Sequence, residues 1–241
     1  MTQKIVYIVL FVMLMPFNGN SQQVSFGLQG GIGTFPMKGL KRINETVVSG
    51  LSFDSKIVSD FPPFFYYRPA FKVKINDLTL GLVYTFQSTG SRVSAKDYSA
   101  EYRYDMIIRS NSPGIYGDIL LIPDNKVQAG LYSVFGCLFT GLKMNEYFIL
   151  LESKLIDDAY RFKSFNFFIE SGFNLNYPVK YLCFGLNGGY LLQLGSGSFH
   201  LAGNKYAKLI NQETGEPVKP GWNGFRAGLS VSYTFHKNPN K

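Results

Sequence analysis

The stretch from Gly224 to Phe235 constrains the fold more than any other part of the chain. Along it, apolar and polar side chains alternate one by one. A period of two is the pattern of a β-strand whose two faces meet different surroundings. The apolar face ends in aromatic residues, whereas the other face carries small residues, hydroxyls and Arg226. This composition suits a strand with hydrocarbon on one side and a narrow polar interior on the other.

Seven further segments share this alternation. We predict strands over residues 24–34, 65–75, 78–87, 102–122, 127–142, 165–177 and 181–194. Pro113 and Gly114 interrupt the segment 102–122, which is therefore predicted either to bend or to begin only near Ile115. Pro69 cannot donate a hydrogen bond to a sheet ladder, so a bulge or a local break in pairing is expected there.

The connections between these strands alternate between two lengths. Short turns are predicted at 76–77, 123–126 and 178–180, and long polar stretches at 35–63, 88–101, 143–163 and 195–221. We expect the long stretches to be loops, and 143–163 could form either a helix or an extended hairpin. The alternation predicts an all-β fold, an eight-stranded antiparallel up-and-down transmembrane β-barrel with short periplasmic turns and long outer loops. Both termini are expected on the short-turn side.

A soluble secreted β-barrel would also alternate, but its apolar set would face inward. In this chain the large set is almost wholly aliphatic or aromatic, and it includes Tyr177, Tyr181 and Tyr233 where strands meet turns. The other set is rich in glycine, serine and asparagine and is too small and too polar to form a solvated exterior. Aromatic residues at strand ends are typical of membrane interfaces. The pattern therefore favours a barrel in lipid.

The N-terminal segment from Met1 to Ser21 has the composition of a secretory signal peptide. Lys4 precedes an apolar run from Ile5 to Met15, and small or polar residues follow. The run is shorter than the ~20 residues that a membrane-spanning helix needs. We therefore predict a signal peptide over residues 1–21, a single barrel domain over residues 22–241, and export to the outer membrane of a Gram-negative bacterium.

Charge and cysteine content exclude little by themselves. The net charge of +8 is compatible with a nucleic-acid or anionic-membrane partner, but the basic residues are spread along the predicted strands, so no nucleic-acid partner is predicted. The alternation places Cys137 outward and Cys183 inward, in strands that are not adjacent. These positions do not favour a disulfide.

The inward-facing positions are predicted to hold a polar network. Its proposed members are Arg68, Lys72, Lys74, Arg103, Asp105, Arg109, Asp118, Glu170 and Arg226. An isolated charge in so narrow an interior would be costly, so we expect these groups to pair. Glu170 and Arg226 lie on strands that one other strand separates, and a long arginine could reach across that distance. We predict a packed plug, and the alternative is a narrow channel that prefers anions.

No motif predicts catalysis, a cofactor or a metal site. The glycines between Gly27 and Gly33 lack the G-x-G-x-x-G spacing and no predicted helix follows them, and the two histidines, His200 and His236, show no zinc-binding pattern. Asp157 and Asp158 on one outer loop and His200 on another could activate water, but such groups are more often simply solvated. The alternative function is therefore an outer-membrane enzyme acting on lipid A or peptide at the outer rim.

Three stretches give the chain a family resemblance: Gln22–Gly31 after the signal, Tyr160–Phe167, and the ending Gly228–Phe235. The chain resembles the small outer-membrane β-barrel proteins of OmpA-type topology that are described as PorT-like. The resemblance implies a non-enzymatic structural or interaction role in adhesion, envelope integrity or secretion-machine assembly. It also implies contact with outer-membrane lipid and lipopolysaccharide, with the barrel-insertion machinery, and with a protein partner through the outer loops.

Overall fold

The computed structural model describes residues 22–51, 55–122, 126–151 and 153–235, so the predicted signal peptide lies outside the described residues. It contains one helix, α2 (Lys38–Gly50), and eleven strands. The strands are β1 (Gln22–Gly33), β2 (Ser55–Asp60), β3 (Phe64–Ile75), β4 (Leu78–Lys96), β5 (Ala100–Ile122), β6 (Gln128–Leu150), β7 (Ser153–Val179), β8 (Leu182–Leu194), β9 (His200–Leu201), β10 (Asn204–Lys208) and β11 (Gly224–Phe235).

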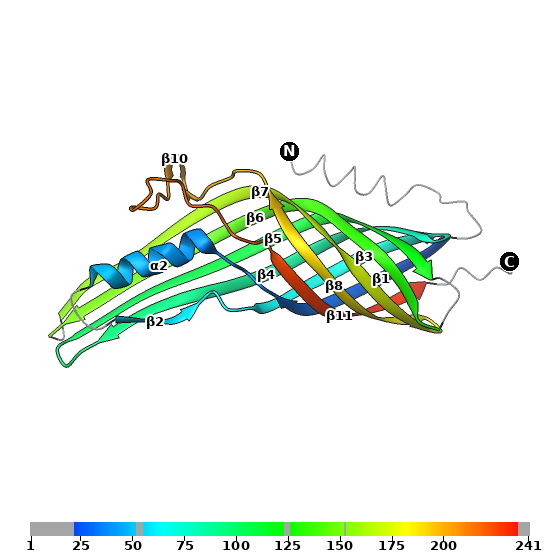
Figure 1. The fold of residues 1–241 in the computed structure, drawn as a ribbon, viewed down its shortest axis with the longest axis horizontal. Helices are drawn as coiled ribbons and strands as arrows, with labels where there is room; N and C mark the ends of the chain where they lie inside the picture. The colour runs from blue at the N-terminus through cyan, green and yellow to red at the C-terminus, as the bar shows by residue number, and fades with distance from the viewer. Residues whose placement is uncertain (1–21, 52–54, 123–125, 152, 236–241) are drawn as a thin grey trace.

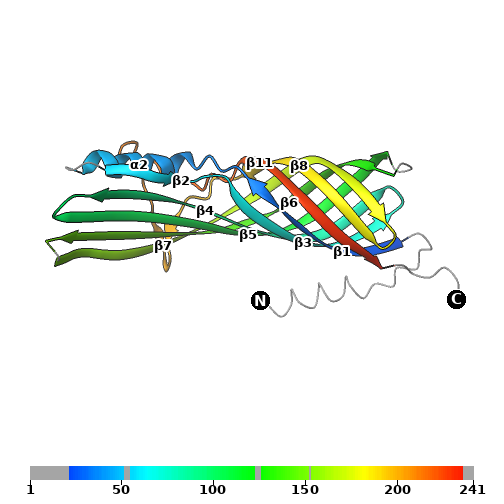
Figure 2. The ribbon, with the colours of Figure 1, turned by 90° about the horizontal axis from the view of Figure 1, so that it is seen from below.

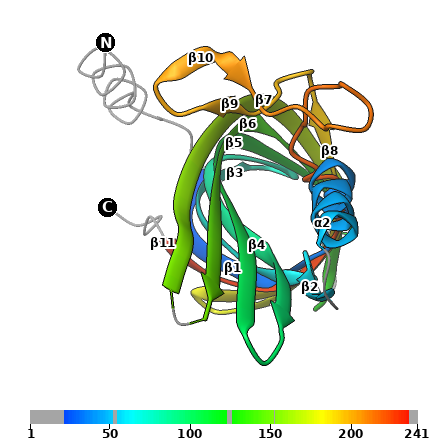
Figure 3. The ribbon, with the colours of Figure 1, turned by 90° about the vertical axis from the view of Figure 1, so that its left-hand side faces the viewer.

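Eight of these strands close into a ring. Each pairs antiparallel with the next in the order β1, β3, β4, β5, β6, β7, β8 and β11, and β11 pairs back with β1 (Figures 1 and 3). The predicted eight-stranded up-and-down barrel is therefore confirmed. Among the described residues, no helix combines the length and the apolar character needed to cross a membrane.

The outside of the ring is an apolar band. Residues such as Phe26, Leu82, Phe173 and Leu229 are about half exposed or more, whereas their neighbours along each strand face the interior. Aromatic pairs edge the band, as where Tyr84 packs against Phe86, Phe139 against Phe165, Tyr190 against Phe225, and Tyr181 against Tyr233. An apolar side chain that remains exposed after folding is stabilised only if its surroundings are apolar rather than water. This surface therefore suits lipid.

The short-turn end of the barrel has the predicted layout. Val24 near the start of β1 pairs with Phe235 at the end of β11, and Ile75 next to the Asn76–Asp77 turn pairs with Gln22. Asn76 has a φ of 54°, a conformation that asparagine tolerates better than most residues. The turn between β7 and β8 is shifted slightly from its predicted place, because β7 continues to Val179.

The long connections differ from the prediction. The segment 35–63 contains α2 and β2, and the stretches 88–101 and 143–163 are continuations of β4, β5, β6 and β7. The extended hairpin is thus the correct alternative for 143–163. These continuations form a sheet beyond the apolar band, and α2 lies against it (Figures 1 and 2). We call the residues 88–96, 100–112, 140–150 and 153–164 the outer sheet.

The two faces of the outer sheet exchange their polarity relative to the barrel. On β4, Leu80 and Leu82 face outward in the band, whereas Arg92 and Lys96 face outward in the outer sheet, with Val93 buried on the inner face. The physical reason is that water replaces lipid outside the strand, so the apolar side chains turn inward. The inner face is covered in part by α2, whose Leu40 and Asn44 are buried.

Two prolines interrupt pairing without shifting its register. Pro69 pairs with Leu28 on β1, but Arg68 and Pro69 have no partner on β4, between the paired residues Tyr67 and Ala70. Pro113 pairs with Tyr84 on β4, and pairing between β5 and β6 resumes at Gly114 in the same register. The local break expected at Pro69 is confirmed, whereas the late start near Ile115, one of the two alternatives for the strand containing Pro113, is wrong because β5 begins at Ala100.

Candidate functional site

An ion cluster crosses the middle of the barrel interior. Glu170 on β7 accepts hydrogen bonds from Arg68 on β3, through Nη1 at 2.8 Å and Nη2 at 2.5 Å. Arg226 Nη1 on β11 donates to the same carboxylate at 2.6 Å. The side chains are at most 2% exposed. A bidentate arginine and a second cation on one buried carboxylate fix three strands relative to one another, none of which pairs with another of the three.

Neutral side chains add further hydrogen bonds to the cluster. Tyr132 Oη donates to Glu170 Oε1 at 3.0 Å, Arg68 Nε donates to Thr85 Oγ1 at 2.8 Å, and Arg226 donates to Gln87 Oε1. Small residues make room for these large groups. A Cβ on Gly228, for example, would lie 2.7 Å from the hydroxyl of Tyr66. The centroid of the Tyr66 ring lies 5.7 Å from the guanidinium carbon of Arg68 and 5.3 Å from that of Arg226. The cluster therefore fills the cross-section of the barrel, and its geometry is that of a structural plug.

The structure divides the nine residues of the predicted network. Arg68, Glu170 and Arg226 form the cluster, while Lys72, Lys74 and Asp118 line the interior nearer the short-turn end. The prediction is wrong for the other three, because they lie on the outer face of the outer sheet: Arg103, Asp105 and Arg109. Arg92 and Arg103 both form salt bridges with Asp105 there. The error follows from the exchange of polarity between the faces of β5.

A cap closes the interior at the long-loop end. Trp222 is fully buried and donates through Nε1 to Thr140 Oγ1 at 3.0 Å, and Phe35 meets its ring edge-on with centroids 5.0 Å apart. Met37 and Phe199, also fully buried, complete this apolar layer. Trp222 lies between the predicted loop 195–221 and the last predicted strand, which begins at Gly224. The only signal that could have found it is that it is the single tryptophan of the chain.

We predict that the protein conducts no ions in planar bilayers. The cap and the ion cluster close the interior at two levels, so Trp222→Ala should also remain silent because the cluster below it is unchanged. Single-channel recording of both proteins is the measurement. Steady, reproducible conductance steps in the wild type would contradict the plug and support the narrow channel.

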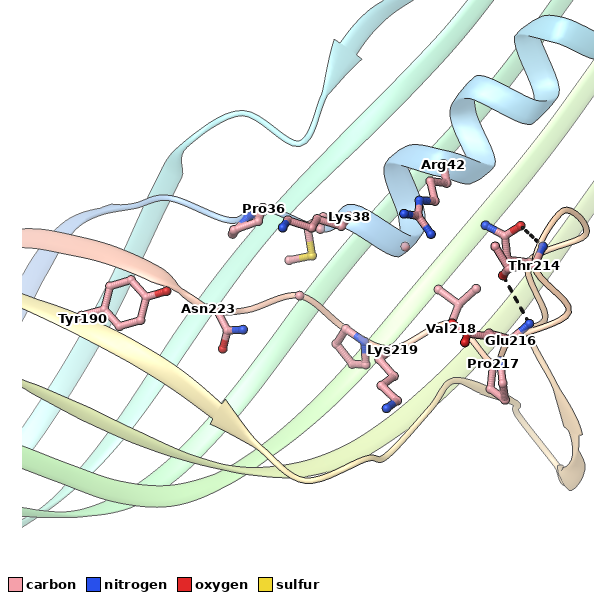
Figure 4. Close-up of a pocket in the computed structure, with 15 residues that line it drawn as sticks. Pro36, Lys38, Arg42, Tyr190, Thr214, Glu216, Pro217, Val218, Lys219 and Asn223 are labelled. Atoms are coloured by element: carbon pink, nitrogen blue, oxygen red, sulfur yellow. Dashed lines mark hydrogen bonds between the residues drawn. The ribbon is translucent and has the colours of Figure 1, made fainter.

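A pocket of about 430 Å³ lies outside the cap, between the start of α2 and the loop before β11 (Figure 4). Lys38 and Arg42 at the start of α2 and Lys219 on the loop give it a positive lining, and Glu216 lies on the same loop as Lys219. The helix begins without a side-chain cap or an acidic residue in its first turn. Both Lys38 and Arg42 are exposed, so water and salt would screen an anion held there, and we assign it no ligand.

The inner face of the outer sheet carries a polar contact. Tyr102 Oη donates to Glu146 Oε1 at 3.0 Å across β5 and β6. Burial, together with this carboxylate, raises the pKa of Tyr102, so the hydroxyl remains protonated and acts as a donor.

The residues considered for catalysis do not meet. His200 pairs with Lys163 on β7, and Asp157 and Asp158 lie roughly 16 to 20 Å further along that strand. Asp157 forms a salt bridge with Lys154, and Asp158 accepts a hydrogen bond from Tyr160. Within the part of the chain that the structure describes, no group of three or more His, Cys, Asp or Glu residues could hold a metal ion. Cys137 and Cys183 are both free thiols.

No family model matches the chain, and no curated protein matches it. Among solved structures, it is similar to a major outer membrane protein from Thermus thermophilus (14% identity, 88% of this chain and 99% of that chain, TM-score 0.46). It is also similar to Ail, the attachment invasion locus protein of Yersinia pestis (12%, 89% and 97%, 0.39), and to the outer membrane protease OmpT from Escherichia coli (9%, 89% and 96%, 0.41). Likenesses at this level of identity assign no activity.

Proposed function

We propose that this chain is a non-enzymatic outer-membrane β-barrel that holds its outer sheet away from the membrane to bind a protein partner. The apolar band supports contact with outer-membrane lipid and lipopolysaccharide, and the aromatic end of β11 at Phe235 suits recognition by the barrel-insertion machinery. The closed interior leaves the outer sheet as the part available for interaction. The observation that carries the proposal is an unpaired strand edge on β7.

The first half of β7 pairs on one side only. From Ser153 to Tyr160 it pairs with β6, and no described strand pairs with its other side until β9 meets Phe162 and Lys163. The backbone N–H of Ala202 donates to the carbonyl of Arg161 at 2.8 Å. The backbone groups of Arg161 therefore point to this second side of β7, away from β6. Because backbone groups alternate along a strand, the N–H and C=O of Ala159 and Asp157 point to the same unoccupied side.

The surroundings of this edge suit strand addition. The other edge of the outer sheet, on β4, is covered by β2, which carries an irregularity between Ile57 and Ser59. On the β7 side, Leu155 and Tyr160 are 57% and 48% exposed beside the unpaired backbone. Proteins usually protect such an edge, and an exposed one with apolar neighbours is a template for another strand. The partner that fits is an extended segment of another protein, held by main-chain hydrogen bonds.

The test removes one edge-facing donor. Ala159→Pro deletes an N–H that does not serve the β6 ladder, whereas the matched control Ala159→Val keeps it. With a photo-cross-linking side chain at Asp157 in intact cells, we expect a cross-linked adduct in the parent and in the valine variant, and its loss in the proline variant. An adduct that still forms in the Ala159→Pro variant, or the absence of any adduct in the parent, would contradict strand addition.

The identity of the adduct decides between the finer roles. A partner from another cell surface would indicate adhesion, whereas a partner from the same envelope would indicate envelope integrity or the assembly of a secretion machine. Folding of each variant is checked by a change in gel mobility on boiling, which a closed barrel gives because its hydrogen bonds resist detergent.

A further inference from the structure

A second cavity lies inside the barrel at the short-turn end. Its volume is about 320 Å³, and its lining includes Lys72, Lys74, Asp118 and Cys183, with Lys180 on the turn at its rim. We infer that this cavity binds a small oxyanion, such as phosphate or the carboxylate of a small metabolite. The inference is independent of the proposed partner at the β7 edge, which lies at the opposite end of the molecule.

The charges inside the barrel do not balance. Below the outer sheet, the inward positions of the eight ring strands carry four cations, Arg68, Lys72, Lys74 and Arg226, and two acids, Asp118 and Glu170, which leaves a formal charge of +2 in this part of the barrel. Glu170 is shared by both arginines. The other three charged groups, Lys72, Lys74 and Asp118, lie at the short-turn end, where one acid faces two cations.

Asp118 does not neutralise the two lysines by direct contact. Its Oδ1 accepts a hydrogen bond from Asn174 Nδ2 at 2.8 Å, and among the described residues no salt bridge joins it to Lys72 or Lys74. The ammonium of Lys72 lies 4.0 Å from the centroid of the Tyr116 ring. This cation–π contact holds the ammonium in place but supplies no counter-charge.

The cavity offers what an oxyanion needs. Two ammonium groups provide charge, and the hydroxyls of Ser232, Thr234 and Thr79 on the same walls provide neutral donors. A cation in a narrow space inside a membrane barrel is costly without a partner, and an anion from solvent removes that cost. The barrel wall separates the cavity from lipid and the ion cluster closes the other direction, so the ligand enters from the solvent at the short-turn end.

Cys183 gives a direct measurement because its side chain lines the same cavity. In a Cys137→Ser background, the neutral reagent iodoacetamide reports access to Cys183. We expect inorganic phosphate to slow alkylation several-fold and with saturation, whereas sodium chloride at equal ionic strength should not. Phosphate that protects no better than chloride would overturn the proposal.

Two variants test whether the lysines bind the anion. Lys72→Met and Lys74→Met keep an unbranched side chain one atom shorter and remove the charge, and each should abolish most of the protection by phosphate. Lys154→Met, at the opposite end of the molecule on the outer sheet, is the control and should leave protection unchanged. If a lysine variant fails the boiling test for folding, protection of the parent protein by phosphate still decides the question. Equal protection in all folded variants would overturn the assignment to Lys72 and Lys74.

Discussion

Glu170→Gln is expected to destabilise the barrel by about 3 to 5 kcal/mol, because it leaves two buried guanidinium groups without their shared anion. Arg68 and Arg226 both contact this one carboxylate, and neither has access to water. The glutamine has nearly the same shape as glutamate, so the effect reports the lost charge. Urea unfolding in lipid vesicles measures the change in the free energy of unfolding. The folded fraction is monitored through the gel-mobility shift on boiling.

Two controls separate the buried charge from a general effect of substitution. Glu101→Gln breaks an exposed salt bridge with Lys96 and should cost less than about 1 kcal/mol. The double variant Glu170→Gln with Arg226→Met removes one of the two stranded cations and should be more stable than Glu170→Gln alone. A loss of less than about 1 kcal/mol for Glu170→Gln would show that the cluster is not the structural plug of the barrel.

The barrel itself could be predicted from the sequence because its strands meet lipid on one side. Phe225, Leu229 and Tyr233 repeat at every second position with small or polar residues between them, and this contrast is visible without a structure. The outer sheet could not be predicted in the same way. Its strands have water outside, so Arg103 and Asp105 stand at outward positions that the barrel pattern assigns to apolar residues.

The ion cluster could be predicted only in part. The sequence suggests the contact of Glu170 with Arg226, because β7 and β11 are separated by β8 alone. It does not suggest Arg68, since β3 is four strands from β7 in either direction around the ring, and the contact exists only because the closed barrel is narrow. Nor does any local pattern show that the segment carrying Trp222 folds back over the interior, because its partners, Thr140 and Phe35, are far from it in the sequence.

Leu229→Arg is expected to destabilise the barrel by about 2 to 4 kcal/mol or to block its insertion, because an arginine there faces the middle of the apolar band. Leu229 is 68% exposed and pairs with Leu186 and Gly30, whose neighbours on the outer surface are also apolar. The charged group has no lumen to enter, since the side chain points away from the interior. Folding into vesicles and urea unfolding of the inserted protein measure the cost.

The matched control is the same substitution on the same face outside the membrane. Ile107→Arg lies on the outer sheet, where the residue is 39% exposed and neighbours Asp105 and Arg109 on the outer face, and it should change stability by less than about 0.5 kcal/mol. Ser230 would be a poor control, because an arginine there would be forced beside Arg68 and Lys72 around a cavity of about 30 Å³. Equal losses for Leu229→Arg and Ile107→Arg would mean that both positions meet the same solvent. The apolar band would then not be a lipid-facing surface, and the exchange of polarity along β5 would need another cause.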